Sequence, residues 1–438
     1  MRTERERATE RLGDWRTDRL VHLNYLSLTN FRNYARLELN LSDRLTVVQG
    51  ANAQGKTNLL EAIHLLATAR SPRAIAEREL INWLALDSSL PYARLAGEIG
   101  TGKDAQKLEL VLEPAANGNN GPTVRKQVRI NGAPKRALDL VGRLRVVLFL
   151  PEDVSLVVGA PAERRRYLDI ALCQISSVYC RSLSEYNRAV SQRNALLRRL
   201  RDSGGDSTQL NFWDMQLAEH GSLIFQQRSR AIQALDRIAA ERHRDLTGGG
   251  ERLRLAYLPG INPDFGQGSA HKEWAPAPRA RRRLTEARPQ YWTLEPEELH
   301  RRFLAQLKHT HARDVAAGTS LLGPHRDDVA FAINEHDLRT FGSRGQQRTA
   351  ALALKLGEVQ LMRDETRDDP LLLLDDVMSE LDAARRRTLL DALGGLTQVI
   401  ATTTDWNDFS GDLLRQACTL RVEAGVLCAA NPDDGRAA

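Results

Sequence analysis

The sequence predicts an α/β protein in which a nucleotide-binding fold is split into two halves by a long helical insertion. Three observations carry this prediction. A glycine-rich loop lies between an apolar strand and a helix near residue 50. A second apolar strand ends in two acids, the second of them at residue 376. Between the loop and these acids, residues 156–250 follow a helical apolar repeat. Nucleotide-binding sheets place such loops and acids at the carboxyl ends of neighbouring parallel strands.

The composition limits the class of protein. The chain has 438 residues, of which 42% are hydrophobic and 27% charged, as in soluble proteins of two or three domains. No apolar run approaches the roughly 18 to 20 residues of a membrane span, and residues 1–20 lack the apolar segment of a secretory signal. We therefore expect a cytoplasmic protein without a membrane partner. The net charge of +6 suits a polyanionic ligand without identifying one.

Five segments are expected along the chain. Residues 1–20 form a disordered extension, or precede the true start near residue 21. Residues 21–155 form the N-terminal part of the nucleotide-binding head, and residues 156–250 form a helical arm with a glycine break at residues 204–205. Residues 251–295 hold a strand and a flexible insertion rich in Arg, Pro and Gly. Residues 296–438 complete the head.

A P-loop motif defines the first half of the site. Its residues fit the pattern GxxxxGK[ST], and they follow a strand at residues 45–48 and precede a helix. The loop N–H groups and the helix N-terminus are expected to hold phosphate oxygens. Lys56 reaches the β- and γ-phosphates, and Thr57 ligates Mg²⁺. The expected nucleotide contacts here are Gly50, Ala51, Asn52, Ala53, Gln54, Gly55, Lys56, Thr57 and Asn58.

Two acids define the second half. The strand at residues 371–374 is followed directly by Asp375 and Asp376, which are expected to emerge beside the P-loop. Asp375 would hold Mg²⁺ with Thr57, and Asp376 would polarise the attacking water. Asp376 is one methylene shorter than a glutamate, so slow hydrolysis is expected. The alternative is a strand end that carries only solvated acids.

A third motif precedes a segment of strong helix formers at residues 349–356. Ser343-Arg344-Gly345-Gln346 offers a hydroxyl, N–H groups and a helix dipole to an anion. It resembles the signature motif of ABC-type ATPases, with Arg344 where transporters carry Gly. We therefore expect Ser343, Gly345 and Gln346 to contact nucleotide, and Lys56, Ser343 and Asp376 to be the catalytic residues.

The spacing of these motifs indicates the subclass. Lys56 and Asp375 are 319 residues apart, whereas Ser343 is only 32 residues before Asp375. The expected fold is therefore a P-loop head of the ABC and SMC type, split by the helical arm. In ABC-type heads the signature serine contacts ATP held by the other subunit. The resemblance thus implies a homodimer that ATP holds together, so that occupancy shifts the monomer–dimer equilibrium.

From residue 21 onward the chain resembles the RecF family, bacterial recombinational-repair ATPases related to the heads of Rad50 and SMC proteins. Two segments depart from the family pattern, residues 1–20 and the long arginine-rich insertion at residues 260–292. The matching segments are residues 28–34 (LTNFRNY), the P-loop, 149–153 (FLPED), 164–169 (RRRYLD), 323–328 (GPHRDD), 342–346 (GSRGQ) and 374–382 (LDDVMSELD).

The resemblance implies a function that the spacing alone does not. It implies ATP-dependent binding to single-stranded, gapped and junction DNA, with ATP and Mg²⁺ as cofactors and a weak, DNA-stimulated ATPase used as a switch. It also implies work with RecO and RecR in loading RecA, and a part in the SOS response. The alternatives are a transporter-type ATPase subunit, an ATP-linked nuclease, or a clamp that binds ATP without turnover.

The arm supplies the candidate DNA contacts. Arginine contacts to phosphates would give salt-dependent, largely sequence-independent affinity, although each arginine could equally belong to a solvated helix face. Two interpretations of the turn at residues 323–328 remain open. His325 and Arg326 lie near the nucleotide or the dimer interface, or His325 has a structural role. The candidate DNA contacts are Arg164, Arg165 and Arg166 at the foot of the arm and Arg193, Arg198 and Arg199 along it.

Overall fold

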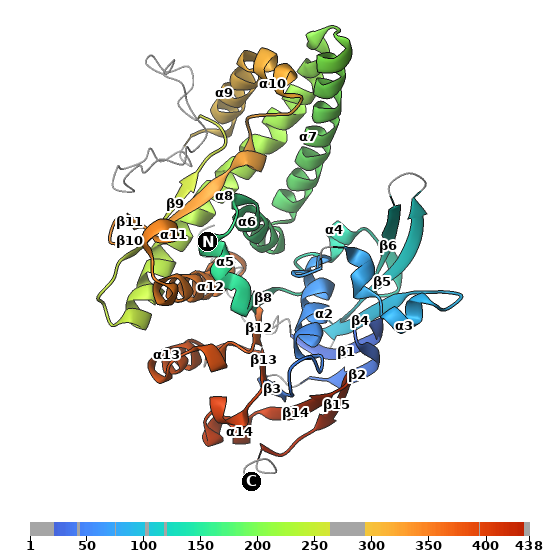
Figure 1. The fold of residues 1–438 in the computed structure, drawn as a ribbon, viewed down its shortest axis with the longest axis vertical. Helices are drawn as coiled ribbons and strands as arrows, with labels where there is room; N and C mark the ends of the chain where they lie inside the picture. The colour runs from blue at the N-terminus through green and yellow to red at the C-terminus, as the bar shows by residue number, and fades with distance from the viewer. Residues whose placement is uncertain are drawn as a thin grey trace, which may run out of the picture. The chain divides into compact units, whose positions relative to one another are not determined.

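A computed structural model gives the fold of the chain (Figure 1). It describes residues 22–41, 44–74, 76–100, 105–117, 121–262, 294–393 and 395–432. The expected extension at residues 1–20 and nearly all of the expected insertion at residues 260–292 lie outside these residues. The chain divides into two compact units. The first takes the chain up to residue 146, residues 368–372 and the chain from residue 396, and the second takes the remainder.

An antiparallel sheet forms much of the first unit, and its strand order is β2-β1-β4-β5-β6-β7. Strand β2 shows buried apolar residues between exposed ones, as expected where one face packs on a core. Leu37 and Leu39 are buried while Arg36 and Glu38 are exposed. The strands are β1 (Leu23–Phe31), β2 (Tyr34–Asn40), β4 (Ala93–Ile99), β5 (Gln106–Asn117), β6 (Gly121–Ile130) and β7 (Ala133–Lys135).

The second sheet carries the P-loop strand, and its order is β15-β14-β3-β13-β12-β8. Strand β3 is parallel to both β13 and β14, and β15 closes the edge antiparallel to β14. The chain passes between the units within β8 and within β12. These strands are β3 (Leu45–Gln49), β8 (Val146–Phe149), β12 (Leu371–Asp375), β13 (Val399–Thr403), β14 (Cys418–Glu423) and β15 (Val426–Ala429).

Helix α2 (Lys56–Thr68) packs against both sheets of the first unit, touching β1, β4 and β5 of one and β13 of the other. Eleven of its thirteen residues are buried, so it is a core helix rather than a surface helix. Its burial fixes where the P-loop ends. The other short elements of this unit are η1 (Glu77–Leu80), α3 (Trp83–Leu86), α4 (Ala137–Leu140), η8 (Trp406–Asp408) and α14 (Gly411–Gln416).

The second unit is mainly helical, with a small antiparallel sheet of order β11-β10-β9. Among the described residues, no helix is both long enough and apolar enough to cross a membrane. The strands are β9 (Leu253–Leu258), β10 (Asp328–Ile333) and β11 (His336–Asp337). The helices outside the arm are η3 (Pro151–Val154), α5 (Ser155–Val158), α9 (Pro296–His309), α10 (His311–Ala317), η6 (Pro324–Arg326), α11 (Leu338–Phe341), α12 (Arg344–Thr366), η7 (Met378–Glu380) and α13 (Ala383–Leu393).

The arm consists of α6 (Pro161–Ile175), α7 (Ser177–Ser203), the short η4 (Ser207–Gln209) and α8 (Leu210–Thr247) (Figure 1). The apolar repeat predicts one helix where α6 and α7 are two, and that prediction is wrong. Ser176 separates them, and its hydroxyl accepts the Tyr179 N–H at 3.2 Å as the N-cap of α7. The apolar repeat continues across this cap, so periodicity does not reveal the break. The predicted end at Gly204 is confirmed, with a positive φ of 67°.

Burial removes Arg193 from the candidate DNA contacts. Its side chain is fully buried between α7, α8 and α10. Its Nε donates to Asp214 at 2.8 Å, and its Nη1 donates to Asp314 at 2.7 Å and to the Ser320 hydroxyl at 2.9 Å. The predicted phosphate contact is therefore wrong. Arg193 joins three helices through partners that local sequence does not reveal.

Arg164 is corrected for the same reason. It is 3% exposed, and its Nε donates to Asp328 on β10 at 2.6 Å. Its Nη1 also donates to the carbonyl oxygen of Gly159 at 2.9 Å. This guanidinium therefore ties α6 to β10 and cannot reach a phosphate. Arg165 is half-buried, whereas Arg166, Arg198 and Arg199 are exposed.

Replacing Arg193 with alanine should destabilise the protein by about 3 to 5 kcal/mol, because it leaves two buried carboxylates without their cation. Urea unfolding followed by circular dichroism measures this change. Arg198→Ala, an exposed arginine on the same helix, should change the free energy of unfolding by no more than about 0.5 kcal/mol. Equal effects of the two variants would show that the buried network does not hold the arm.

Candidate nucleotide-binding site

The P-loop contains two residues with left-handed backbone and two glycines that no larger residue could replace. Gly55 has a φ of +122° and Ala53 a φ of +66°, so the backbone curls back on itself between β3 and α2. A Cβ on Gly50 would lie 2.6 Å from the carbonyl oxygen of Val422, and one on Gly55 would lie 2.7 Å from Asn33 Nδ2. Both positions therefore exclude larger residues.

The loop carbonyls are held from outside by the turn between β1 and β2. Tyr34 Oη donates to the carbonyl of Gly55 at 2.9 Å, and Asn33 Nδ2 donates to the carbonyl of Gln54 at 2.8 Å. Asn58 Nδ2 in turn donates to Asn33 Oδ1 at 2.8 Å. Burial raises the pKa of Tyr34, so its hydroxyl remains a donor. These bonds fix the backbone where the loop enters α2, at the carbonyls of Gln54 and Gly55.

The sequence prediction missed this support. Asn33 and Tyr34 were named only as part of the matching segment at residues 28–34, with no role at the nucleotide site. One sequence feature could have indicated it: the polar turn Arg32-Asn33-Tyr34 lies one strand before the P-loop strand. Arg32 adds a further link, because its Nε pairs with Glu61 of α2 at 2.9 Å.

Lys56 lies over the inner side of the loop. Its Nζ donates to the carbonyls of Gly50 at 2.6 Å and Ala51 at 3.1 Å. The first turn of α2, all of which the structure describes, contains no acidic residue. The positive end of the helix dipole and the Lys56 ammonium both lie at this loop, and this donor set fits a polyphosphate.

Strand β13 lies beside the P-loop strand β3, within the same unit. The Gly50 N–H donates to the carbonyl of Thr403 at 3.2 Å, and Gln49 Nε2 donates to the carbonyl of Thr404 at 3.1 Å. The Thr403 hydroxyl is held by Asp408 at 2.6 Å. The end of β13 is thus coupled to the start of the loop through backbone and side-chain bonds.

The two acids follow strand β12 in the second unit, as predicted. Asp375 is 5% exposed at the strand end. Asp376 has a φ of +52°, a left-handed backbone that aspartate tolerates better than most residues. The Ser379 hydroxyl donates to the carbonyl of Asp376 at 2.7 Å and closes the turn. Their approach to Lys56 and Thr57 stays a prediction.

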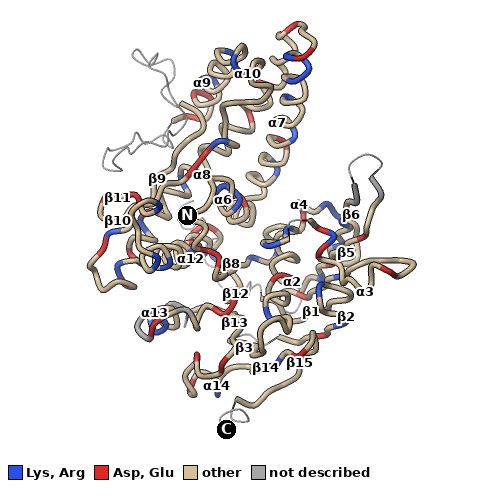
Figure 2. Tube along the Cα trace, viewed as in Figure 1, with Lys and Arg blue, Asp and Glu red and all other residues tan. Residues whose placement is uncertain are grey.

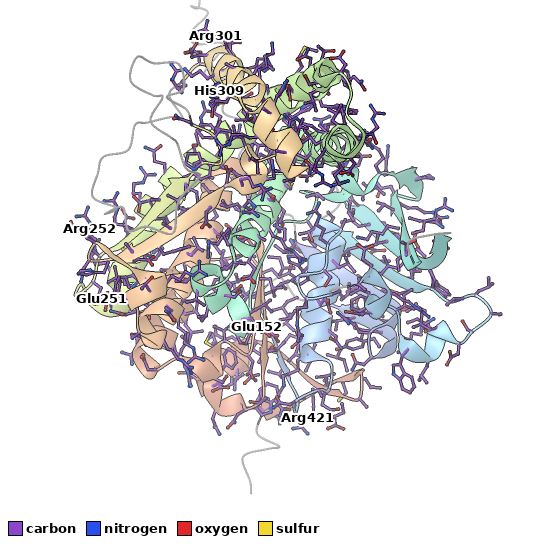
Figure 3. All side chains as sticks on the ribbon, turned by 45° about the horizontal axis from the view of Figure 1, so that its top comes forward. Glu152, Glu251, Arg252, Arg301, His309 and Arg421 are labelled. Carbon is purple, nitrogen blue, oxygen red and sulfur yellow. The ribbon has the colours of Figure 1, made fainter. Side chains whose placement is uncertain are left out.

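The signature motif forms the N-terminus of α12, also in the second unit. Ser343 is the N-cap, and its Oγ accepts the Gln346 N–H at 3.2 Å while Gln346 Oε1 accepts the Ser343 N–H at 2.8 Å. Gln346 Nε2 also donates to Glu251 at 2.8 Å; Glu251 is labelled in Figure 3. Gln346 thus orders the turn, while Ser343, Arg344 and Gly345 are exposed.

The turn at residues 323–328 braces the arm. Asp327 is buried and accepts hydrogen bonds from Arg228 Nη1 of α8 and from the Gly260 N–H, both at 2.6 Å, and from the Tyr257 hydroxyl. Arg228 also donates to the carbonyl of Pro324 at 2.7 Å. The turn therefore joins α8 to β9 and β10.

His325 has the structural role that the sequence left open. Its Nε2 donates to the carbonyl of Ser320 at 3.0 Å, and its Nδ1 accepts the Tyr186 hydroxyl at 2.7 Å. Burial lowers the pKa of His325 to about 4, so the ring is neutral at physiological pH. This arrangement ties the turn to α7.

Stability should therefore depend on His325 in mildly acidic solution. Between pH 6.5 and pH 4 the unfolded chain binds a proton at this histidine and the folded chain does not, so the free energy of unfolding falls as the pH falls. His325→Gln should lessen this fall in urea titrations across the window. Burial raises the pKa of Asp153 to about 6, which gives the opposite slope in both proteins and cancels in their difference. Identical slopes for the two proteins would contradict the assignment.

The chain is similar in sequence to a protein family and to several known proteins. Residues 22–415 match the family model of the RecF/RecN/SMC N terminal domain. The chain is 41% identical over 416 residues to the DNA replication and repair protein RecF of Herpetosiphon aurantiacus, covering 93% of this chain and 99% of the relative. It is 35% identical over 409 residues to RecF of Bacillus cereus, covering 93% and 98%.

A solved structure is also similar to this chain over nearly its full length. It is that of the recombination mediator protein RecF with ATP in the RecFOR pathway, with a TM-score of 0.78 and 30% identity over 95% of this chain and all of that one. These similarities confirm the predicted fold class, a P-loop head of the ABC and SMC type with a helical arm.

Proposed function

Because the chain belongs to the RecF family, we propose that it is an ATP-gated DNA-binding protein of replication and repair. ATP closes a homodimer on DNA, and slow hydrolysis releases it. Family membership favours this function over that of a transporter-type ATPase subunit. It also supports work with RecO and RecR in loading RecA on single-stranded, gapped or junction DNA, and a part in the SOS response.

The exposed signature turn is the observation that carries the proposal. The first-turn N–H groups of Arg344 and Gly345 have no acceptor within the helix, and both residues are exposed beside the Ser343 hydroxyl. An arginine at the first position of a helix is electrostatically unfavourable, unless an anion binds there. The short helix α11, just before the signature, ends at Phe341, which is 63% exposed. This surface suits the nucleotide of a second copy, with an apolar contact beside it.

The residues of the two halves fit ATP and Mg²⁺. The P-loop would offer its backbone N–H groups, the N-terminus of α2 and Lys56 to the phosphates. Thr57 and Asp375 would hold Mg²⁺, which neutralises phosphate charge. Asp376 would orient the attacking water, and its short side chain would make turnover slow. Ser343 and Gly345 would complete the site from the partner.

The remaining arm arginines are the proposed DNA contacts. Arg166, Arg198 and Arg199 are exposed and can form phosphate contacts, which position DNA without reading its sequence. Arg165 contributes less, because its Nη1 already donates to the carbonyl of Asp327 at 2.7 Å. Salt should weaken this binding steeply.

Asp376→Asn should trap an ATP-dependent dimer on gapped duplex DNA, because ATP still binds but hydrolysis slows by at least about tenfold. Lys56→Ala should lose both the dimer and the ATP-dependent binding. Fluorescence anisotropy of the labelled DNA, with light scattering on the same samples, measures the two effects.

Lys107→Ala is the matched control, since Lys107 is an exposed lysine of the same unit, and it should behave as the wild type. The proposal fails if the wild type, Asp376→Asn and Lys56→Ala bind the DNA alike and all stay monomeric with ATP.

A further inference from the structure

We propose that the outer end of the arm binds unpaired nucleotides, with Phe212 stacking on a base and the surrounding cations holding the phosphates. This arm tip comprises residues 196–216 and 308–318. The inference rests on the proposed DNA-binding function, and it adds the form of DNA and the place where its single strand is held.

The arm tip is one packed piece. Leu197 and Leu200 of α7 form a buried apolar cluster with Leu210, the first residue of α8, and Val315 of α10 packs against it. The Arg201 guanidinium covers the end of α10, where a Cβ on Gly318 would lie 2.5 Å from its Nη1. The ends of three helices therefore present their side chains on one fixed surface.

This surface is positively charged. Its exposed acids are engaged locally, since Asp202 pairs with Arg201 at 2.9 Å and Asp206 accepts the Thr208 N–H at 2.8 Å. Asp214 and Asp314 are buried against Arg193. The next exposed acid, Glu219, lies further along α8. The exposed cations of the arm tip are Arg198, Arg199, Arg201, Lys308 and Arg313, and Figure 2 shows the basic positions along α7 and α10.

Further basic side chains lie on α9, beside the arm tip, where Arg301 is paired with Glu298 of the same helix. Arg301 and His309 are both exposed on this helix and are labelled in Figure 3. Helix α9 packs against α8, and His311, just beyond its end, reaches Asp214 of α8 at 2.5 Å. The end of α9 therefore lies beside the first turns of α8. A bound strand can continue from the arm tip onto α9.

Two exposed apolar side chains lie within this basic surface. Phe212 is 55% exposed and Met215 is 50% exposed, both in the first two turns of α8. The Phe212 ring is braced edge-on by Trp213, with ring centres 4.9 Å apart. The Arg199 guanidinium donates to Gln209 Oε1, three residues before Phe212. It therefore lies on the same side of the first turn of α8 as Phe212.

The combination favours single-stranded DNA over duplex. An exposed aromatic ring among cations is the arrangement on which unpaired bases stack, whatever their sequence, while the cations follow the backbone. In a duplex the faces of the bases are occupied by their neighbours, so that Phe212 has nothing to stack on. Phosphate contacts alone would serve both forms of DNA equally.

The test uses the full chain with ATP, labelled oligo(dT) and a blunt duplex of equal length. Phe212→Ala should weaken binding to oligo(dT) about tenfold or more and leave duplex binding unchanged. Arg198→Gln with Arg199→Gln should weaken binding to both probes. On oligo(dT), each arginine removed should lower the salt dependence by about 0.7 in log K per log salt. Trp83→Ala, an aromatic that is 69% exposed in the other unit, and Arg181→Gln at the base of α7 are the controls.

Ultraviolet cross-linking of oligo(dT) gives a direct readout that does not depend on a variant, and the adduct should map to Phe212 or its neighbours on α8. Matching thermal midpoints exclude misfolding of Phe212→Ala. If the wild type binds duplex with ATP but Phe212→Ala holds oligo(dT) equally well and adducts map elsewhere, this inference alone fails. If the wild type binds neither probe, the proposed function fails with it.

Discussion

The hydrogen bonds that satisfy the P-loop carbonyls are the constraint on which the first unit depends. A loop can present its N–H groups to phosphates only if its carbonyls are satisfied elsewhere. Asn33 and Tyr34 satisfy them from the β1–β2 turn, and the Gly425 N–H adds a bond of 3.0 Å to Gln54 from the β14–β15 turn. Two sheets and a core helix thus meet at one loop. Each bond contributes only about 1 kcal/mol, but together they fix its shape before any ligand binds.

The second unit depends on buried guanidinium groups instead. Arg193 and Arg228 each bind two carboxylates in the interior of the arm. Such ion pairs offset their desolvation only with well-placed partners, so they specify one arrangement of helices more than they stabilise it. A rigid arm keeps the exposed arginines and Phe212 in fixed positions. The arm also leads into β9, and Glu251 just before this strand accepts a hydrogen bond from Gln346 of the signature.

The sequence predicted what is local and missed what is not. The P-loop, the acids after β12 and the N-cap Ser343 are each readable from a few neighbouring residues, and the arm from its apolar period. The cap at Ser176 was hidden because the apolar period continues through it. Arg164 and Arg193 were misjudged because each pairs with an aspartate more than a hundred residues away, Asp328 and Asp314 respectively. No local pattern distinguishes a buried arginine from a DNA contact.

The central claim is that Ser343 serves the nucleotide of the partner copy, and mixing two inactive variants tests it most directly. Lys56→Ala lacks the phosphate lysine and Ser343→Arg lacks the signature hydroxyl, so each homodimer should have almost no ATPase activity. In a mixed dimer one site combines both defects and the other is intact. An equimolar mixture should therefore recover activity, up to about half of the wild-type rate, because each mixed dimer has one working site of two. A mixture no more active than its components would contradict the claim.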